Sequence, residues 1–312
     1  MLDITIISGF LGAGKTTLIN QLLRDGVFPR NTLLVENEFG EIGVDAALLE
    51  KSYPVLELGS GCICCSIGAD FVEQVCRLVT QHQPEALLIE PSGCADLGEF
   101  VKQCRQVCHR TGGVIRRVIT VVNGEAVLAQ LELGGPFFRN QLAEAPFLAI
   151  SCMDAVEPQE RQMILEELGI LNQNAPICML PMDSAQLLFR SAESYRTFNE
   201  NRDNPRGVLL RKMGLQMQSV SIHPGRISPE RAEAFLASAA RGDYGTILRI
   251  KGFLDLEGVG TGYLEYIPGK TPSITHREDS ATSGLVIIGR NLDVQVLSRV
   301  LDGTFHRGRP LR

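Results

Sequence analysis

A glycine-rich segment near the N-terminus constrains this chain more than any other feature. The segment Gly9-Phe10-Leu11-Gly12-Ala13-Gly14-Lys15-Thr16-Thr17 matches the pattern G-x-x-x-x-G-K-[ST], and it lies between an apolar run and a helical pattern of apolar residues. In such a strand–loop–helix unit, glycines let backbone N–H groups turn toward a phosphate, and the helix N-terminus adds partial positive charge. We therefore expect a nucleoside triphosphate to bind here, with Lys15 reaching the β- and γ-phosphates and Thr16 ligating Mg²⁺. The residues expected to contact the nucleotide in this loop are Gly9, Gly12, Ala13, Gly14, Lys15, Thr16 and Thr17.

The first two-thirds of the chain alternates between strand-like and helix-like patterns. Apolar runs typical of strands occupy 4–7, 33–36, 86–90, 115–122 and 147–150, and amphipathic patterns typical of helices lie near 15–25, 69–82, 96–109, 124–133 and 157–168. This alternation predicts an α/β fold, in which helices flank a parallel sheet. A polar, mixed-charge run at 199–205 predicts a linker over 191–207. We thus expect a P-loop NTPase domain at 1–190 and a smaller α+β domain, with a mostly antiparallel sheet, at 208–312.

The composition argues against some classes of partner. The formal net charge is −6, whereas surfaces that bind nucleic acid are basic because they neutralise phosphates. No apolar run approaches the roughly 20 residues of a membrane-spanning helix, and the chain opens with an expected core strand rather than a signal peptide. We expect neither nucleic acid nor a membrane as partner, and a cytoplasmic location in which the nine cysteines are reduced.

Three cysteines within four residues form a second constellation. Cys62, Cys64 and Cys65 precede an expected helix start at 68–69, and the positive end of a helix lowers the pKa of nearby thiols. Thiolates are soft ligands, so the cluster suits a transition metal, with Cys62 and one of the other two as the minimum ligand set. A buried apolar turn and a redox pair are the alternatives. Cys104 and Cys108, four apart on an expected helix, present a similar choice between a metal site and core packing.

The glycine-rich loop and the cysteine cluster together resemble the CobW family of P-loop GTPases. Its nucleotide-binding domain is of the CobW/HypB/UreG type, and its members are metal chaperones or metallocofactor-insertion proteins. The resemblance extends over about residues 2–302. The matching segments are 9–17 (GFLGxGKTT), 36–45 (which contains the switch motif NEFGE-x-x-x-D), 61–65 (GCxCC), 90–93 (E-x-[ST]-G), 247–253 (R-x-KG-F) and 286–290 (a later strand).

This resemblance implies roles for several carboxylates and one glycine. Glu36, Glu38 and Asp45 would bind Mg²⁺ through water, orient the attacking water or help ligate the transported metal. Glu90 ends an apolar strand, where it would hold a Mg²⁺-bound water, and Gly93 would donate its N–H to the γ-phosphate. The implied mechanism couples the nucleotide state to the geometry of the cysteine site, so that metal is held or released accordingly. The implied catalytic residues are Lys15, Thr16, Glu38 and Glu90, and the implied metal ligands are Thr16, Glu36, Asp45, Cys62, Cys64 and Cys65.

The segment expected to recognise the base departs from the family pattern N/T-K-x-D. It reads Ser151-Cys152-Met153-Asp154, so the aspartate that accepts hydrogen bonds from guanine is kept, while Lys is replaced by Cys152 and the bracing Asn by Ser151. We expect GTP as the preferred nucleotide because of Asp154, with ATP as an alternative if base selectivity is relaxed. Asn123 also stands where the family has an aspartate, and a neutral amide suits a charged role less well.

These observations favour a GTPase that hydrolyses slowly without a partner, because no arginine finger is evident in the switch segment. It would deliver Zn²⁺, or alternatively Co²⁺ or Fe²⁺, to a client metalloprotein, and a homodimer is one possible assembly. Two other functions stay open. One is a nucleotide-gated activator of a metalloenzyme or corrinoid enzyme with little turnover, and the other is a P-loop small-molecule kinase.

Overall fold

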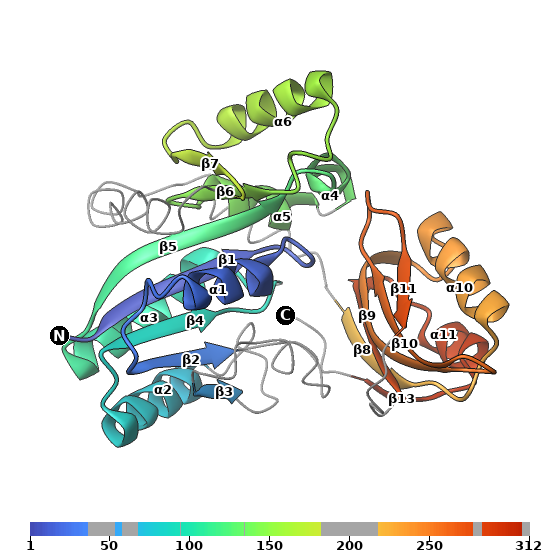
Figure 1. The fold of residues 1–312 in the computed structure, drawn as a ribbon, viewed down its shortest axis with the longest axis horizontal. Helices are drawn as coiled ribbons and strands as arrows, with labels where there is room; N and C mark the ends of the chain where they lie inside the picture. Colours follow the sequence, from blue (N-terminus) through green and yellow to red (C-terminus); the bar gives the residue numbers. More distant parts are fainter. Residues whose placement is uncertain are drawn as a thin grey trace. The chain divides into compact units, whose positions relative to one another are not determined.

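The structure is a computed structural model. It describes residues 1–36, 54–57, 68–93, 95–133, 135–181, 218–276 and 283–307. The chain divides into two compact units, and each is built on a β-sheet of its own (Figure 1). The parallel sheet lies in the N-terminal unit and the antiparallel sheet in the C-terminal unit.

The first sheet has seven strands in the order β3-β2-β4-β1-β5-β6-β7, and every described pairing between them is parallel. Its central strands are buried along most of their length, as expected where both faces of a parallel sheet are covered. All seven strand ends therefore line up at one edge, where the loops that follow them meet. The strands are β1 (Asp3–Gly9), β2 (Thr32–Glu36), β3 (Val55–Glu57), β4 (Ala86–Glu90), β5 (Val114–Asn123), β6 (Leu148–Ser151) and β7 (Ile177–Met179).

Helices cover both faces of this sheet. On one face α1 packs its apolar side, including Leu18 and Leu22, against alternate strand residues such as Ile7, Leu88 and Val121. The residues between them, exemplified by Ile6 and Ile89, point to the opposite face and are fully buried as well. The helices that follow β1 and precede β7 in the chain are α1 (Lys15–Arg24), α2 (Gly68–His82), α3 (Leu97–Thr111), α4 (Val127–Leu133), α5 (Gly135–Ala143) and α6 (Pro158–Leu171), and of these α4 falls almost wholly within the second compact unit.

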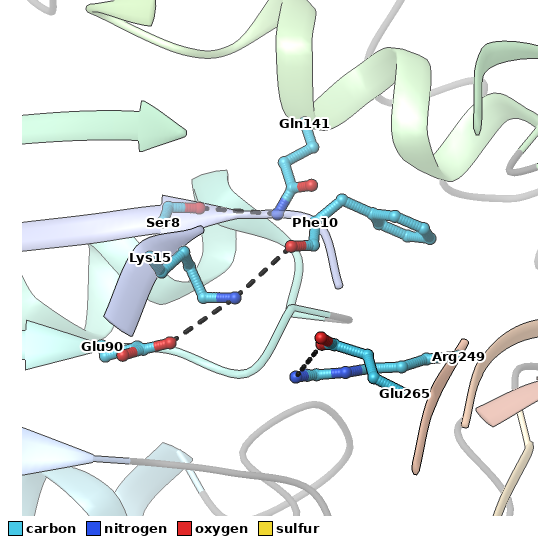
Figure 2. Close-up of polar contacts among 7 residues, drawn as sticks. All are labelled: Ser8, Phe10, Lys15, Glu90, Gln141, Arg249 and Glu265. Atoms are coloured by element: carbon cyan, nitrogen blue, oxygen red, sulfur yellow. Dashed lines mark hydrogen bonds and ion pairs between the residues drawn. The ribbon is translucent and has the colours of Figure 1, made fainter. Parts of the chain in front are cut away.

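The second sheet has six strands in the order β11-β10-β9-β12-β8-β13, all paired antiparallel. Helices α10 and α11 pack on one face of it and close an apolar core that contains Phe235, Ile250 and Leu297 (Figure 1). Arg249 alternates with Ile250 and so lies on the other face, 3.9 Å from Glu265 (Figure 2). The elements are β8 (Gln218–His223), α10 (Pro229–Arg241), β9 (Thr246–Leu256), β10 (Gly260–Tyr266), β11 (Ser273–His276), β12 (Gly284–Arg290), α11 (Val294–Val300) and β13 (Thr304–Arg307).

The predicted fold class is confirmed by these two sheets. The structure adds elements that the sequence patterns did not reveal, among them the three-residue strands β3 and β7 and helix α5. The predicted linker at 191–207 lies outside the described residues, so the domain boundaries stay a prediction. Within the described residues, no helix combines the length and apolar character that a membrane span requires.

Candidate nucleotide-binding site

The glycine-rich loop connects the end of β1 to the start of α1. Gly9 has a φ of 146°, and a Cβ placed on it would lie 2.3 Å from the Val121 carbonyl oxygen, so only glycine fits. Gly14 caps α1 in the left-handed conformation, with φ 95°, and Lys15 is the first helical residue. The first turn of α1 therefore presents backbone N–H groups that have no partner within the helix. This geometry is suited to an anion.

The Lys15 side chain is only 6% exposed, and its ammonium lies between Glu90 and the Phe10 carbonyl group (Figure 2). Its Nζ is 3.5 Å from Glu90 Oε1 and 3.4 Å from the Phe10 carbonyl oxygen. A buried charge is costly unless it is paired, and here a carboxylate and a carbonyl oxygen supply that compensation. The same ammonium is the group expected to meet the phosphates, so a triphosphate that bound here would compete with Glu90 for it.

Two carboxylates stand side by side at the ends of neighbouring strands. Glu36 on β2 is in register with Glu90 on β4, and both are nearly buried. Both lie on the α1 side of the sheet, since residues two positions earlier on the same strands pack against α1. On the next strand of the sheet, β3, the backbone of Glu57 is paired in register with Glu36. The carboxylates of Glu36 and Glu90 and the hydroxyl of the half-buried Thr16 are oxygen ligands of the kind that Mg²⁺ takes, so the residues present fit this ion.

Side chains from two other strand ends anchor the loop from behind. Asn123 Nδ2 donates to the Gly12 carbonyl oxygen at 3.2 Å, and Ser151 Oγ donates to the Ala13 carbonyl oxygen at 2.8 Å. The loop thus has a brace at position 151 even though the family's Asn is replaced there. Nothing in the sequence signalled the Asn123 contact, because it joins residues 111 apart in the chain.

The candidate base-recognition segment follows β6 directly. Met153 is buried, and a Cβ on Gly124 would lie 2.8 Å from its sulfur, so the two segments pack closely. Arg161 holds the segment from α6, donating to the backbone oxygens of Asp154 at 2.9 Å and Val156 at 2.6 Å. The Asp154 side chain is left exposed at the surface, where a base could reach it.

Gly93, expected near the γ-phosphate, lies beside the glycine-rich loop. A Cβ placed on Gly93 would come within 2.8 Å of the Leu11 backbone nitrogen and 2.7 Å of its Cδ2. The two segments therefore touch through their backbones, and this contact requires glycine. The structure thus brings Gly93, Glu90 and Lys15 together at one end of the sheet.

Several predicted site residues lie outside the described part of the chain. They are Glu38, Asp45, Cys62, Cys64 and Cys65, so their expected roles stay predictions. Among the residues that the structure describes, no three His, Cys, Asp or Glu side chains converge as a metal site would require.

The Cys104–Cys108 pair has the environment of core residues. Cys104 is fully buried on α3. Its pKa lies well above the ordinary value, mainly because burial disfavours the charged thiolate and, to a smaller extent, because Cys108 is close. Burial also raises the pKa of Cys108. Metal ligation needs thiolates, and burial disfavours the charged thiolate at both positions, which favours the core-packing alternative.

A buried polar contact near the loop was not predicted. Gln141 on α5 places its Nε2 3.5 Å from Ser8 Oγ on β1, one residue before the loop begins (Figure 2). Phe10 also packs edge-on against Phe138 of α5, with ring centroids 4.9 Å apart. Helix α5 carries no motif, so sequence patterns gave no signal that it supports the site.

Comparisons with known proteins agree with this geometry. Residues 3–179 match the family described as CobW/HypB/UreG, nucleotide-binding domain, and residues 217–305 match the cobalamin synthesis protein CobW C-terminal domain. The zinc chaperone YeiR of Escherichia coli K12 is 31% identical over 160 residues, which are 51% of this chain and 49% of that protein. A zinc chaperone CobW of a Sinorhizobium species is 36% identical over 40% of this chain and 37% of its own length. The zinc chaperone CobW of Pseudomonas aeruginosa PAO1 is 26% identical over 96% of this chain and 90% of its own length. The matched stretches thus span about half or less of the first two relatives.

Proposed function

The chain belongs to the CobW/HypB/UreG family of nucleotide-binding proteins, and from this premise we propose that it is a GTPase acting as a metallochaperone. In this role it couples GTP hydrolysis to the transfer of a transition metal to a client protein. The arrangement that carries the proposal is the buried Lys15–Glu90 pair at the mouth of the phosphate loop, with Glu36 in register beside it. Three relatives named zinc chaperones make Zn²⁺ the leading cargo, and Co²⁺ and Fe²⁺ are the alternatives.

Binding of GTP exchanges the partners of Lys15. The ammonium leaves Glu90 and the Phe10 carbonyl oxygen and contacts the β- and γ-phosphates, while the N–H groups at the start of α1 take up the remaining phosphate oxygens. Glu90 would then hold a water on Mg²⁺, which Thr16 and Glu36 would help to bind. Mg²⁺, when bound, offsets the negative charge on the phosphates.

Hydrolysis breaks the bond between the γ-phosphorus and the oxygen that bridges it to the β-phosphate. A water oxygen bonds to the γ-phosphorus, and the products are GDP and inorganic phosphate. Glu38, in the switch segment, is the residue we assign to orient this water. Gly93 donates its N–H to the γ-phosphate, and loss of that phosphate removes the contact and releases the switch.

The metal cargo is assigned to Cys62 with Cys64 or Cys65, with Glu36 and Asp45 as candidate additional ligands. Soft thiolates favour Zn²⁺, and they follow the switch segment closely in the chain. A change in the switch on hydrolysis would therefore alter the ligand geometry and release the metal to the client. This client is a metalloprotein, and a homodimer is a possible working assembly. The proposed domain limits are 1–190 and 208–312.

The test is GTP hydrolysis by the purified protein with Mg²⁺, measured with Zn²⁺, Co²⁺, Fe²⁺ or no added transition metal. A Cys64→Ala/Cys65→Ala variant and a Lys15→Ala variant run in parallel, with ATP as the control nucleotide. We expect one of these metals to stimulate GTP hydrolysis by the unchanged protein. In the cysteine variant, the hydrolysis rate should no longer respond to that metal. Turnover indifferent to metal and to the cysteines would overturn the chaperone function. Tight GTP binding with negligible turnover would instead support a nucleotide-gated activator, and phosphoryl transfer to a small molecule would support a kinase.

A further inference from the structure

Two carbonyl groups of the phosphate loop are held by side chains that the proposed mechanism does not use. Asn123, at the end of β5, donates to the Gly12 carbonyl oxygen at 3.2 Å. Ser151, at the end of β6, donates to the Ala13 carbonyl oxygen at 2.8 Å, with the Val122 carbonyl oxygen at 3.3 Å as a second acceptor. The two anchors reach consecutive peptide units of the loop.

These anchors are rigid because the two strand ends are tied to each other. The Gly124 N–H donates to the Ser151 carbonyl oxygen at 2.8 Å. The two strand ends approach closely here, because a Cβ placed on Gly124 would lie 3.1 Å from the same oxygen. Asn123 is 1% exposed, so its amide has little freedom to move away. The strands β5 and β6 therefore present the two donors to the loop as one unit.

Holding a carbonyl group fixes the amide on the other side of the same peptide. A trans peptide is planar, with its C=O and N–H pointing in opposite directions. The Ala13 carbonyl oxygen turned toward Ser151 therefore directs the Gly14 N–H away from β6. The Gly12 carbonyl oxygen turned toward Asn123 likewise directs the Ala13 N–H into the loop, where it donates to the Phe10 carbonyl oxygen at 3.2 Å.

We propose that Asn123 and Ser151 are positioning residues, which hold the phosphate loop in the conformation that receives the β-phosphate. This inference rests on the proposed nucleotide binding and adds two residues to it. The chemistry requires donors at both positions, because each faces a carbonyl oxygen. The Asn123 amide meets that requirement. An aspartate at position 123 can only accept hydrogen bonds, so it would place a second acceptor against the Gly12 carbonyl oxygen.

The affinity for phosphate is the quantity that should change. Removing one neutral hydrogen bond by Asn123→Ala or Ser151→Ala should weaken GTP binding by about three- to tenfold. Asn123→Asp should weaken it more than Asn123→Ala, since it buries a charge beside an acceptor. Ser151→Thr keeps the hydroxyl and should restore affinity close to that of the unchanged protein.

The experiment compares the affinities of each variant for GTP and GMP by calorimetric titration of the full chain. GMP has the base and the α-phosphate but not the β-phosphate, so a positioning role lowers the affinity for GTP and leaves that for GMP unchanged. Thr120→Val is the matched control, because Thr120 is fully buried on the same strand and its hydroxyl has no hydrogen-bond partner among the described residues. This control should leave both affinities unchanged.

Two results would overturn the inference. One is an unchanged GTP affinity in both alanine variants, and the other is an equal loss for GTP and GMP, which would indicate general destabilisation. Should Asn123→Ala fail to fold, the contrast between Ser151→Ala and Ser151→Thr decides the matter alone. If the unchanged protein binds GMP and GTP equally, the loop does not bind the β- and γ-phosphates, and the proposed function itself fails.

Discussion

Replacing Glu90 by glutamine should change nucleotide affinity in opposite directions with and without Mg²⁺. In the free protein the Glu90 carboxylate lies 3.5 Å from the Lys15 ammonium. The Glu90 side chain is 12% exposed and the Lys15 side chain 6%. A triphosphate has to take the ammonium from this carboxylate and then lie close to its negative charge. Glu90→Gln removes both obstacles, so binding without Mg²⁺ should become tighter.

The geometry sets the size of this effect. Two unit charges 3.5 Å apart attract each other by about 5 kcal/mol at an effective dielectric constant of about 20. A glutamine side chain still accepts a hydrogen bond from Lys15, so only part of this energy is released. We expect a gain of about 1.4–2.8 kcal/mol, which is about ten- to hundredfold tighter binding of GTP in EDTA. With Mg²⁺ the variant should bind GTP more weakly than the unchanged protein and hydrolyse it more slowly, because the ligand of the Mg²⁺-bound water is lost.

Titration of a fluorescent GTP analogue in EDTA and in Mg²⁺ measures both effects. Glu99→Gln is the matched control, since Glu99 is an exposed carboxylate on α3 that pairs only with Lys102 among the described residues. Its affinities should equal those of the unchanged protein. Weaker or unchanged binding of GTP by Glu90→Gln in EDTA would refute the reasoning that Glu90 competes with phosphate for Lys15.

Three further predictions concern the base, the stability and a thiol. Asp154→Ala should weaken GTP binding by about ten- to hundredfold and leave ATP binding unchanged, because a charged acceptor for guanine is lost; equal losses for both nucleotides in competition titrations would contradict this. Asn172→Ala should lower the free energy of unfolding by about 3 kcal/mol in urea titrations, since its buried amide donates to two backbone oxygens at 2.8 Å, and an unchanged urea midpoint would argue against it. Burial raises the pKa of Cys178 to about 11 from 9.0, so the folded state keeps this thiol protonated and loses stability as the pH rises from about 9 toward 11. Iodoacetamide at pH 8 should therefore alkylate Cys178 much more slowly in the folded protein than in urea, as followed by mass spectrometry.

The elements that sequence patterns predicted are those in which the signal is local. The strands at the centre of the first sheet are rich in apolar residues, and helix α1 follows the loop with an apolar face. Strands β3 and β7 were missed because three residues are too few to show a period. Helix α5 was missed because it begins with Gly135-Pro136, which reads as a loop in the sequence.

The expected roles of Ser151 and Asn123 differ from their places in the structure. The sequence suggested that a brace was lost at position 151, but a serine hydroxyl reaches the Ala13 oxygen because β6 ends close to the loop. Asn123 was judged only as a neutral substitute for a charge, whereas its amide group donates to Gly12. Single residue types therefore indicated which chemistry was lost and could not show which contact replaced it.

The sequence by itself determined the phosphate loop, the parallel sheet that carries it and the family to which the chain belongs. These follow from spacings within a few tens of residues, because helices, strands and the loop are formed by near neighbours. Only the tertiary structure decided that Lys15 is paired with Glu90, and that Asn123 and Ser151 anchor the loop from 111 and 138 residues away. Such contacts depend on the order and register of strands in the sheet, which bring distant strand ends to one edge, and no local pattern encodes that order.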